Sequence, residues 1–83
     1  MVAPELVIEI ISPTDRWSDI RKKIEEYFAI GVLWIWVLEP SERDVLLYRS
    51  ATEFQKLREG DILRGEGILE GFALSVADLF ADF

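Results

Sequence analysis

Residues 4–23 read PELVIEIISPTDRWSDIRKK, and this stretch decides the fold of the chain. Residues 6–11 are aliphatic except for Glu9, so they predict a strand, which Pro4 can begin and Pro13 ends. Apolar residues on both faces of this strand indicate an interior strand that is covered on both sides. A carboxylate in such a strand is costly to bury without a partner or an ion. The surroundings of Glu9 are therefore the main question that the sequence raises.

A helix is predicted next, from about Asp15 or Arg16 to Ile30. Its apolar residues recur at helical spacing and form one stripe, made of Trp17, Ile20, Ile24, Tyr27 and Phe28. Thr14 or Asp15 can cap the start of this helix, and Gly31 can end it in a left-handed conformation.

Two neighbouring lysines of this helix have different predicted surroundings. At about 100° per residue, Lys22 points away from the apolar stripe, whereas Lys23 lies on its border. Lys23 can therefore lay its aliphatic stem along the apolar face and direct its ammonium group towards the sheet. Lys22 is expected in solvent, where it can pair with Glu26.

The rest of the chain predicts more strands and a short terminal helix. Residues 32–38 indicate a buried strand, so the order strand, helix, strand predicts a βαβ unit with parallel strands and a right-handed crossover. Residues 45–49 and 53–58 then predict an antiparallel meander, followed by a short piece at 62–63 and a glycine-rich loop. Ser75, with Asp78 three residues later, can cap a last short helix. The predicted fold class is mixed α/β (α+β), in a single domain over residues 1–83.

Composition narrows the possible chemistry. The chain has no His and no Cys, which excludes imidazole and thiolate sites and leaves hard, oxygen-liking cations such as Mg²⁺ or Mn²⁺. A net charge of −7 argues against strong nucleic-acid binding by this chain alone. The apolar run 31–38 is far shorter than the roughly 18 residues that span a bilayer, so we expect no membrane segment. Without cysteines or an export signal, a cytoplasmic location is the expectation.

Glu9 and Lys23 are the candidate site residues. In a βαβ unit, an acid in the first strand and a lysine at the border of the helix stripe can converge at one edge of the sheet. A carboxylate beside a lysine fits metal-dependent phosphodiester hydrolysis, because the acid can hold Mg²⁺ while the lysine orients water or stabilises charge on the phosphate. On spacing alone, the favoured interpretation is a buried ion pair between Glu9 and Lys23, or between Asp19 and Lys23, without any catalytic role.

Three acids lie at or just after the end of the buried strand, namely Glu39, Glu42 and Asp44. Such a group is compatible with a cation site. A solvated turn is the favoured interpretation, because acidic side chains are seldom buried.

Several segments carry a resemblance to a known family. They are PELVIEIISP at 4–13, the spacing of Asp19, Lys23 and Tyr27, and GVLWIWVLEP at 31–40. Together they resemble the Uma-type family of restriction-endonuclease-like proteins, within the PD-(D/E)XK nuclease superfamily. The closing stretch GILEGFALSVADLF at 67–80 is similar to the end of that family. The resemblance covers nearly the whole chain.

The resemblance implies roles for individual residues. Glu9 matches the acid of the (D/E)XK element and is implied to be a metal ligand and catalytic residue. Ile11 stands where the lysine of that element is expected, and Lys23 on the helix matches the place to which the family moves it. The main-chain carbonyl of Ile10 is a further implied metal ligand, as in related nucleases. The implied cofactor is Mg²⁺ or Mn²⁺, and the implied reaction is DNA phosphodiester hydrolysis.

The resemblance also implies that half of a domain is missing. Members of this family are about twice as long, and their N-terminal half supplies a helix, strands and a further metal-binding Asp. We therefore expect weak or no nuclease activity from this chain alone, with DNA binding only through the complete domain. Exposed apolar surface should be covered by a homodimer or by the missing half. The alternative function is a non-catalytic module that keeps the nuclease-like core and self-associates.

Overall fold

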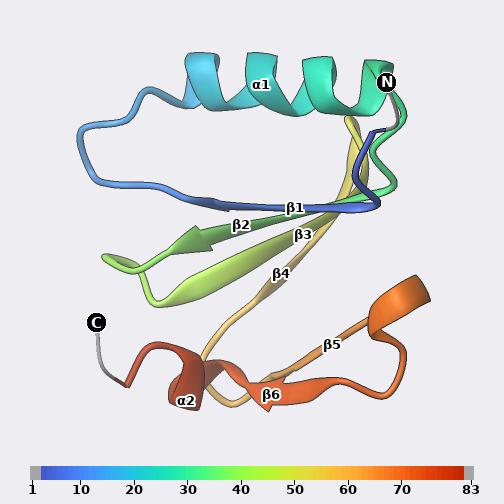
Figure 1. The fold of residues 1–83 in the computed structure, drawn as a ribbon. Helices are drawn as coiled ribbons and strands as arrows, with labels where there is room; N and C mark the ends of the chain where they lie inside the picture. The colour runs from blue at the N-terminus through green and yellow to red at the C-terminus, as the bar shows by residue number, and fades with distance from the viewer. Residues whose placement is uncertain (1–2, 82–83) are drawn as a thin grey trace.

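The fold has three layers, with the four-stranded sheet in the middle (Figure 1). The structure, a computed structural model, describes residues 3–81, and of Ile68 the backbone only. Helix α1 (Trp17–Ala29) covers one face of the sheet, while a separate hairpin and a short helix cover the other (Figure 1). In the part of the chain that the structure describes, no helix is long and apolar enough to cross a membrane.

The βαβ unit forms as predicted. Strand β1 (Leu6–Ile10) and strand β2 (Trp34–Glu39) are parallel neighbours, and Glu9 lies opposite Val37 in their register. Parallel strands need a long connection, and α1 supplies it. Gly31 follows the helix with a φ of +103°, the left-handed conformation that its position predicted.

An antiparallel meander extends the sheet from β2. Strand β3 (Asp44–Ser50) pairs with β2, and strand β4 (Glu53–Leu57) pairs with β3, which gives the order β1-β2-β3-β4. Both predicted meander strands are therefore confirmed. The tight β2–β3 turn places Arg43 at a φ of +54°, and its guanidinium group donates to the Phe80 carbonyl, 3.2 Å away.

The C-terminal segment forms the layer on the sheet face opposite α1 (Figure 1). Strand β5 (Ile62–Arg64) pairs with strand β6 (Ala73–Ser75), and the loop between them contains a 3₁₀ turn at Gly67–Leu69. Strand β6 is absent from the sequence-based prediction, because three residues without a β-branched side chain give little strand signal. Helix α2 (Val76–Leu79) begins as predicted: the Asp78 amide donates to the Ser75 hydroxyl at 3.0 Å.

Two apolar cores lie on the two faces of the sheet. The core under α1 contains Ile20, Ile24, Val32, Ile35, Val37, Leu46 and Tyr48. The core on the opposite face contains Trp36, Leu38, Val45, Leu47, Leu57, Leu63, Val76 and Phe80. Alternate residues of β2 and β3 enter different cores, so these two strands are the ones covered on both sides.

Strand β1 differs from its prediction as an interior strand. Within the described residues it pairs with β2 alone and forms an edge of the sheet. Ile8 and Ile10 retain 51% and 59% of their accessible surface. Their apolar character indicates a covered strand, but residues 3–81 supply neither a neighbour for this edge nor cover for these two side chains.

The start of α1 also differs from the prediction. Arg16 occupies the cap position, and no side chain accepts a hydrogen bond there. Asp15 instead accepts from the Ser12 amide at 2.8 Å, and the Asp15 amide donates to the Ser12 carbonyl. The carboxylate that could cap the helix therefore closes the turn between β1 and α1.

Candidate functional site

Glu9 is held by two side chains of α1. The Lys23 ammonium lies 3.3 Å from Glu9 Oε2, and the Tyr27 hydroxyl donates to Glu9 Oε1 at 3.0 Å. Lys23 and Tyr27 are four residues apart, so one helix face presents both groups to the same carboxylate. Each oxygen of Glu9 thus has a different partner.

The position of Glu9 follows from strand geometry. Alternate residues of β1 point to opposite faces, and Glu9 points to the face that α1 covers. Its side chain keeps 20% of its accessible surface, whereas that of Lys23 keeps 50%. Lys23 therefore reaches inwards from solvent, as its place on the border of the helix stripe predicted. The Lys23 ammonium can therefore move from the carboxylate into solvent while the aliphatic stem stays on the helix surface.

Tyr27 is a neutral donor to Glu9. The hydrogen bond to Glu9 raises the pKa of the Tyr27 phenol, burial and the Glu9 charge raise it further, and the Lys23 charge opposes them. Tyr27 was predicted only as part of the apolar stripe and of the family spacing. Its position four residues after Lys23 is the signal by which its contact with Glu9 could have been found.

The sequence predicted two alternative ion-pair partners for Lys23, Glu9 and Asp19. The structure brings Lys23 to Glu9, and no ion pair joins Asp19 to Lys23 among residues 3–81. Lys23 is half exposed and Glu9 is only partly buried, so this ion pair lacks the burial that the sequence interpretation expected.

The Ile10 carbonyl lies on the open side of β1. The Ile11 amide donates to the Leu38 carbonyl of β2 at 3.0 Å, and the Glu5 carbonyl accepts from Leu33 and Trp34. Because successive backbone groups alternate along a strand, the Ile10 carbonyl faces the free edge. It stays a predicted metal ligand. Among the described residues, no group of three or more acids could hold a metal ion.

The acids after β2 correct a prediction. Glu39 and Asp44 are 9% and 5% exposed and lie opposite each other in the β2–β3 register, whereas Glu42 is exposed. The solvated-turn interpretation is therefore wrong for Glu39 and Asp44, which are the last residue of β2 and the first of β3. Sequence reasoning placed both acids outside the strands, where solvent would reach them.

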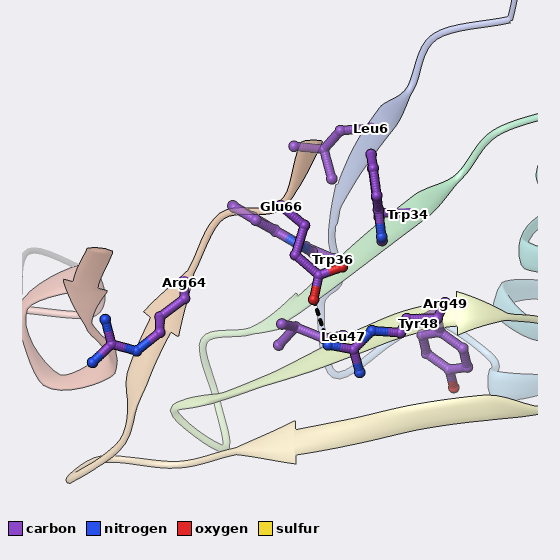
Figure 2. Close-up of a pocket in the computed structure, with 8 residues that line it drawn as sticks. All are labelled: Leu6, Trp34, Trp36, Leu47, Tyr48, Arg49, Arg64 and Glu66. Carbon is purple, nitrogen blue, oxygen red and sulfur yellow. Dashed lines mark hydrogen bonds and ion pairs between the residues drawn. The ribbon is translucent and has the colours of Figure 1, made fainter. Parts of the chain in front are cut away.

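A small cavity lies on the sheet face opposite α1, as Figure 2 shows. Leu6, Trp34 and Trp36 line it, and an ion pair between Arg49 and Glu66 lies across it (Figure 2). Its volume of about 10 Å³ corresponds to about one water molecule. This cavity is separated from Glu9 by the sheet and is too small for a substrate.

Residues 1–77 match the family described as "Uma2: Putative restriction endonuclease". The chain belongs to the Uma2 family. A crystal structure of a "putative nuclease belonging to DUF820" from Anabaena variabilis is similar to it, with a TM-score of 0.84 and 27% identity. No curated protein matches this chain.

Uma2 membership confirms the resemblance that the sequence motifs indicated, and the solved relative confirms the predicted fold class. The similarity covers 98% of this chain but only 46% of that relative. This chain therefore spans less than half the length of the solved Uma2-like structure, as expected for a fragment of the domain.

Proposed function

We propose that this chain contributes part of the active site of a metal-dependent DNA endonuclease. The observation that carries the proposal is the convergence of Lys23 and Tyr27 on Glu9, the acid that the family resemblance assigns to the metal. Membership of the Uma2 family supports the nuclease class. The activity belongs to the complete domain, so the chain alone is expected to be weak or inactive.

Glu9, Lys23 and Tyr27 take separate roles in this proposal. Tyr27 fixes the Glu9 carboxylate by donating a hydrogen bond to Oε1 from α1. Lys23 contacts Oε2 with a half-exposed side chain, so it can turn to a phosphate oxygen or an attacking water when substrate is present. Lys23 is then the residue that stabilises developing negative charge, while Glu9 keeps its position.

The donors present fit a hard cation in type but are too few to hold it alone. The Glu9 carboxylate and the Ile10 carbonyl would hold Mg²⁺ or Mn²⁺ together with ligands from outside this chain. Such a cation supplies charge stabilisation and a more acidic bound water. Tyr27 leaves Oε2 as the Glu9 oxygen for the cation, because it already occupies Oε1.

A titration of Mn²⁺ into the purified chain, followed by thermal melting, tests the site. We expect Mn²⁺ to raise the melting temperature of the parent chain and to have a smaller effect on Glu9→Gln. Glu25→Gln is the matched control, because Glu25 is an exposed acid of α1 and the substitution removes the same charge. An equal response of all three proteins would contradict a metal role for Glu9. A selective loss in Glu9→Gln would justify plasmid-nicking assays with Lys23→Met.

A second candidate function is self-association through β1. The observation that favours it is the free edge of this strand, beside the half-exposed Ile8 and Ile10. An unpaired strand edge is a template for another strand. A second copy could pair there, or the rest of a Uma2 domain could supply the strand.

Sedimentation velocity separates self-association from a monomer. We expect Ile8→Lys to shift a dimer towards monomer, because lysine at a strand edge opposes pairing. Ile62→Lys is the control, since Ile62 is 44% exposed but belongs to β5, in the separate two-stranded sheet. A parent chain that sediments as a monomer at all concentrations would rule out the homodimer.

A further inference from the structure

Glu39 and Asp44 form a buried pair of acids at the end of the β2–β3 hairpin. They are register partners, so both side chains lie on the sheet face that α1 covers. Asp44 Oδ2 lies 3.8 Å from the Lys56 ammonium, which is long for a hydrogen bond. Asp44 Oδ1 is buried, and no donor among the described residues reaches it. A buried acceptor without a donor is costly, so this atom needs an explanation.

A proton provides the missing donor. Two charged carboxylates side by side repel each other, and the half-exposed Lys56 cannot neutralise both. A protonated carboxyl group has an O–H donor that a carboxylate lacks. We propose that Glu39 and Asp44 share one proton in a carboxyl–carboxylate hydrogen bond, which makes the β2–β3 hairpin respond to pH. In this arrangement Glu39 donates and Asp44 accepts.

The electrostatics agree with this geometry. Burial is the largest cause that raises the pKa of Glu39, followed by the hydrogen bond to Asp44 and the charge of Asp44, and the pKa reaches about 7. Lys56 opposes the rise, and Glu42 adds a little to it. The pair therefore gains and loses its proton in the neutral range, where an ordinary glutamate stays charged.

Other charged groups face Glu39 from the elements around it. A groove of about 400 Å³ has Glu39 and Lys56 in its walls together with Arg21 of α1 and Tyr48 of β3. On the other side, Asp15 of the β1–α1 turn lines a neighbouring hollow with Glu39. The groove gives solvent a route to the pair, so the proton can exchange without unfolding.

The proton also matters for the Glu9 site, although the proposal does not depend on nuclease activity. Glu9 pairs in register with Val37, and Glu39 is the next residue of β2 on that same face. Release of the proton adds one negative charge to this face at the end of β2. The charge near the candidate metal ligand therefore changes with pH through a residue that need not touch the substrate.

Carboxyl-carbon NMR of the chain with ¹³C-labelled Glu side chains tests the proposal. We expect one glutamate signal to titrate near pH 7 and to vanish in Glu39→Gln. Asp44→Asn should lower that midpoint by roughly one pH unit, because a neighbouring charge is removed. Lys56→Met should raise it. Glu42→Gln is the matched control, since it removes an exposed acid of the same turn and should leave the midpoint nearly unchanged.

Two results would overturn the shared proton. One is a Glu39 signal that titrates together with the exposed glutamates. The other is a midpoint near 7 that does not move in Asp44→Asn, because the pair would then not be the cause. Repeating the titration with Mg²⁺, which is diamagnetic and leaves the carbon signals visible, gives a third such result: a lowered midpoint in the parent chain that persists in Glu9→Gln would assign the pair to a cation instead of a proton. These outcomes can be read whether or not Mg²⁺ binds at Glu9.

Discussion

Glu9 and Glu39 lie on the same face of neighbouring strands, yet their carboxyl groups have opposite kinds of partner. Glu9 has a donor for each oxygen, a phenol and an ammonium from one helix. Glu39 has another acid, Asp44, as its register partner. The Lys56 ammonium lies beside Asp44. The first carboxylate accepts from two donors, whereas the second shares a proton with its neighbour in the proposed pair.

The difference shows that the partner of a buried acid matters more than its burial. Glu9 was the expected site because it interrupts an aliphatic run. Glu39 ends a run of similar character, but Pro40 and the following polar residues suggested a turn in solvent. Only the hairpin register brings Asp44 to it.

The largest expected effect is on the pH dependence of stability. The pKa of Glu39 is raised from 4.5 to about 7 in the fold, so the folded chain holds a proton that the unfolded chain loses earlier. Stability should therefore fall as the pH rises from about 4.5 to about 7, by roughly 2–3 kcal/mol at 1.36 kcal/mol per pKa unit. Urea unfolding at pH 5 and pH 8 measures this loss. Glu39→Gln should remove most of it, and an unchanged slope would show that other groups cause the effect.

A smaller effect is expected at the other acid. Tyr27→Phe removes the hydrogen bond to Glu9 Oε1 and should lower the free energy of unfolding by about 1–2 kcal/mol near pH 7. Repeating the substitution in a Glu9→Gln background gives a double-mutant cycle. The cost should shrink in that background, because the charged acceptor is gone. Equal costs in both backgrounds would mean that Tyr27 acts only through packing.

The smallest expected effect on stability is that of Lys23→Met. The ion pair with Glu9 is half exposed at Lys23, so its loss should change the free energy of unfolding by less than about 1 kcal/mol. Urea unfolding beside Lys22→Met, which replaces the neighbouring exposed lysine, provides the comparison. A loss of several kcal/mol would indicate a structural ion pair and weaken the case for a lysine kept free to act on substrate.

The sequence predicted the central elements because each had a strong local signal. The aliphatic run ended by Pro13 predicted β1, and the stripe from Trp17 to Phe28 predicted α1. Strand β6 was missed because its three residues pair only with β5, a contact that local patterns do not encode. The edge position of β1 was missed for a related reason: apolar residues show that a strand prefers cover, not whether cover is present.

The candidate site was predictable where helix spacing alone decided it. Lys23 could be directed to the sheet from its angle around the helix, and the contact with Glu9 followed. The Glu39–Asp44 pair could not be found in that way, because it depends on which residues face each other across a turn. A slip of one residue in that register would send the two side chains to opposite faces.

Among residues 3–81, β1 has one neighbouring strand, and this has a consequence for local opening. A strand held on one side can separate from the sheet at a smaller free-energy cost than β2 or β3, which have neighbours on both sides. The Val7 and Glu9 amides should therefore exchange with solvent faster than the Val37 and Leu46 amides. A strand that docks on the free edge would slow this exchange. How firmly the Glu9 carboxylate is held in place thus depends on the strand that docks beside β1.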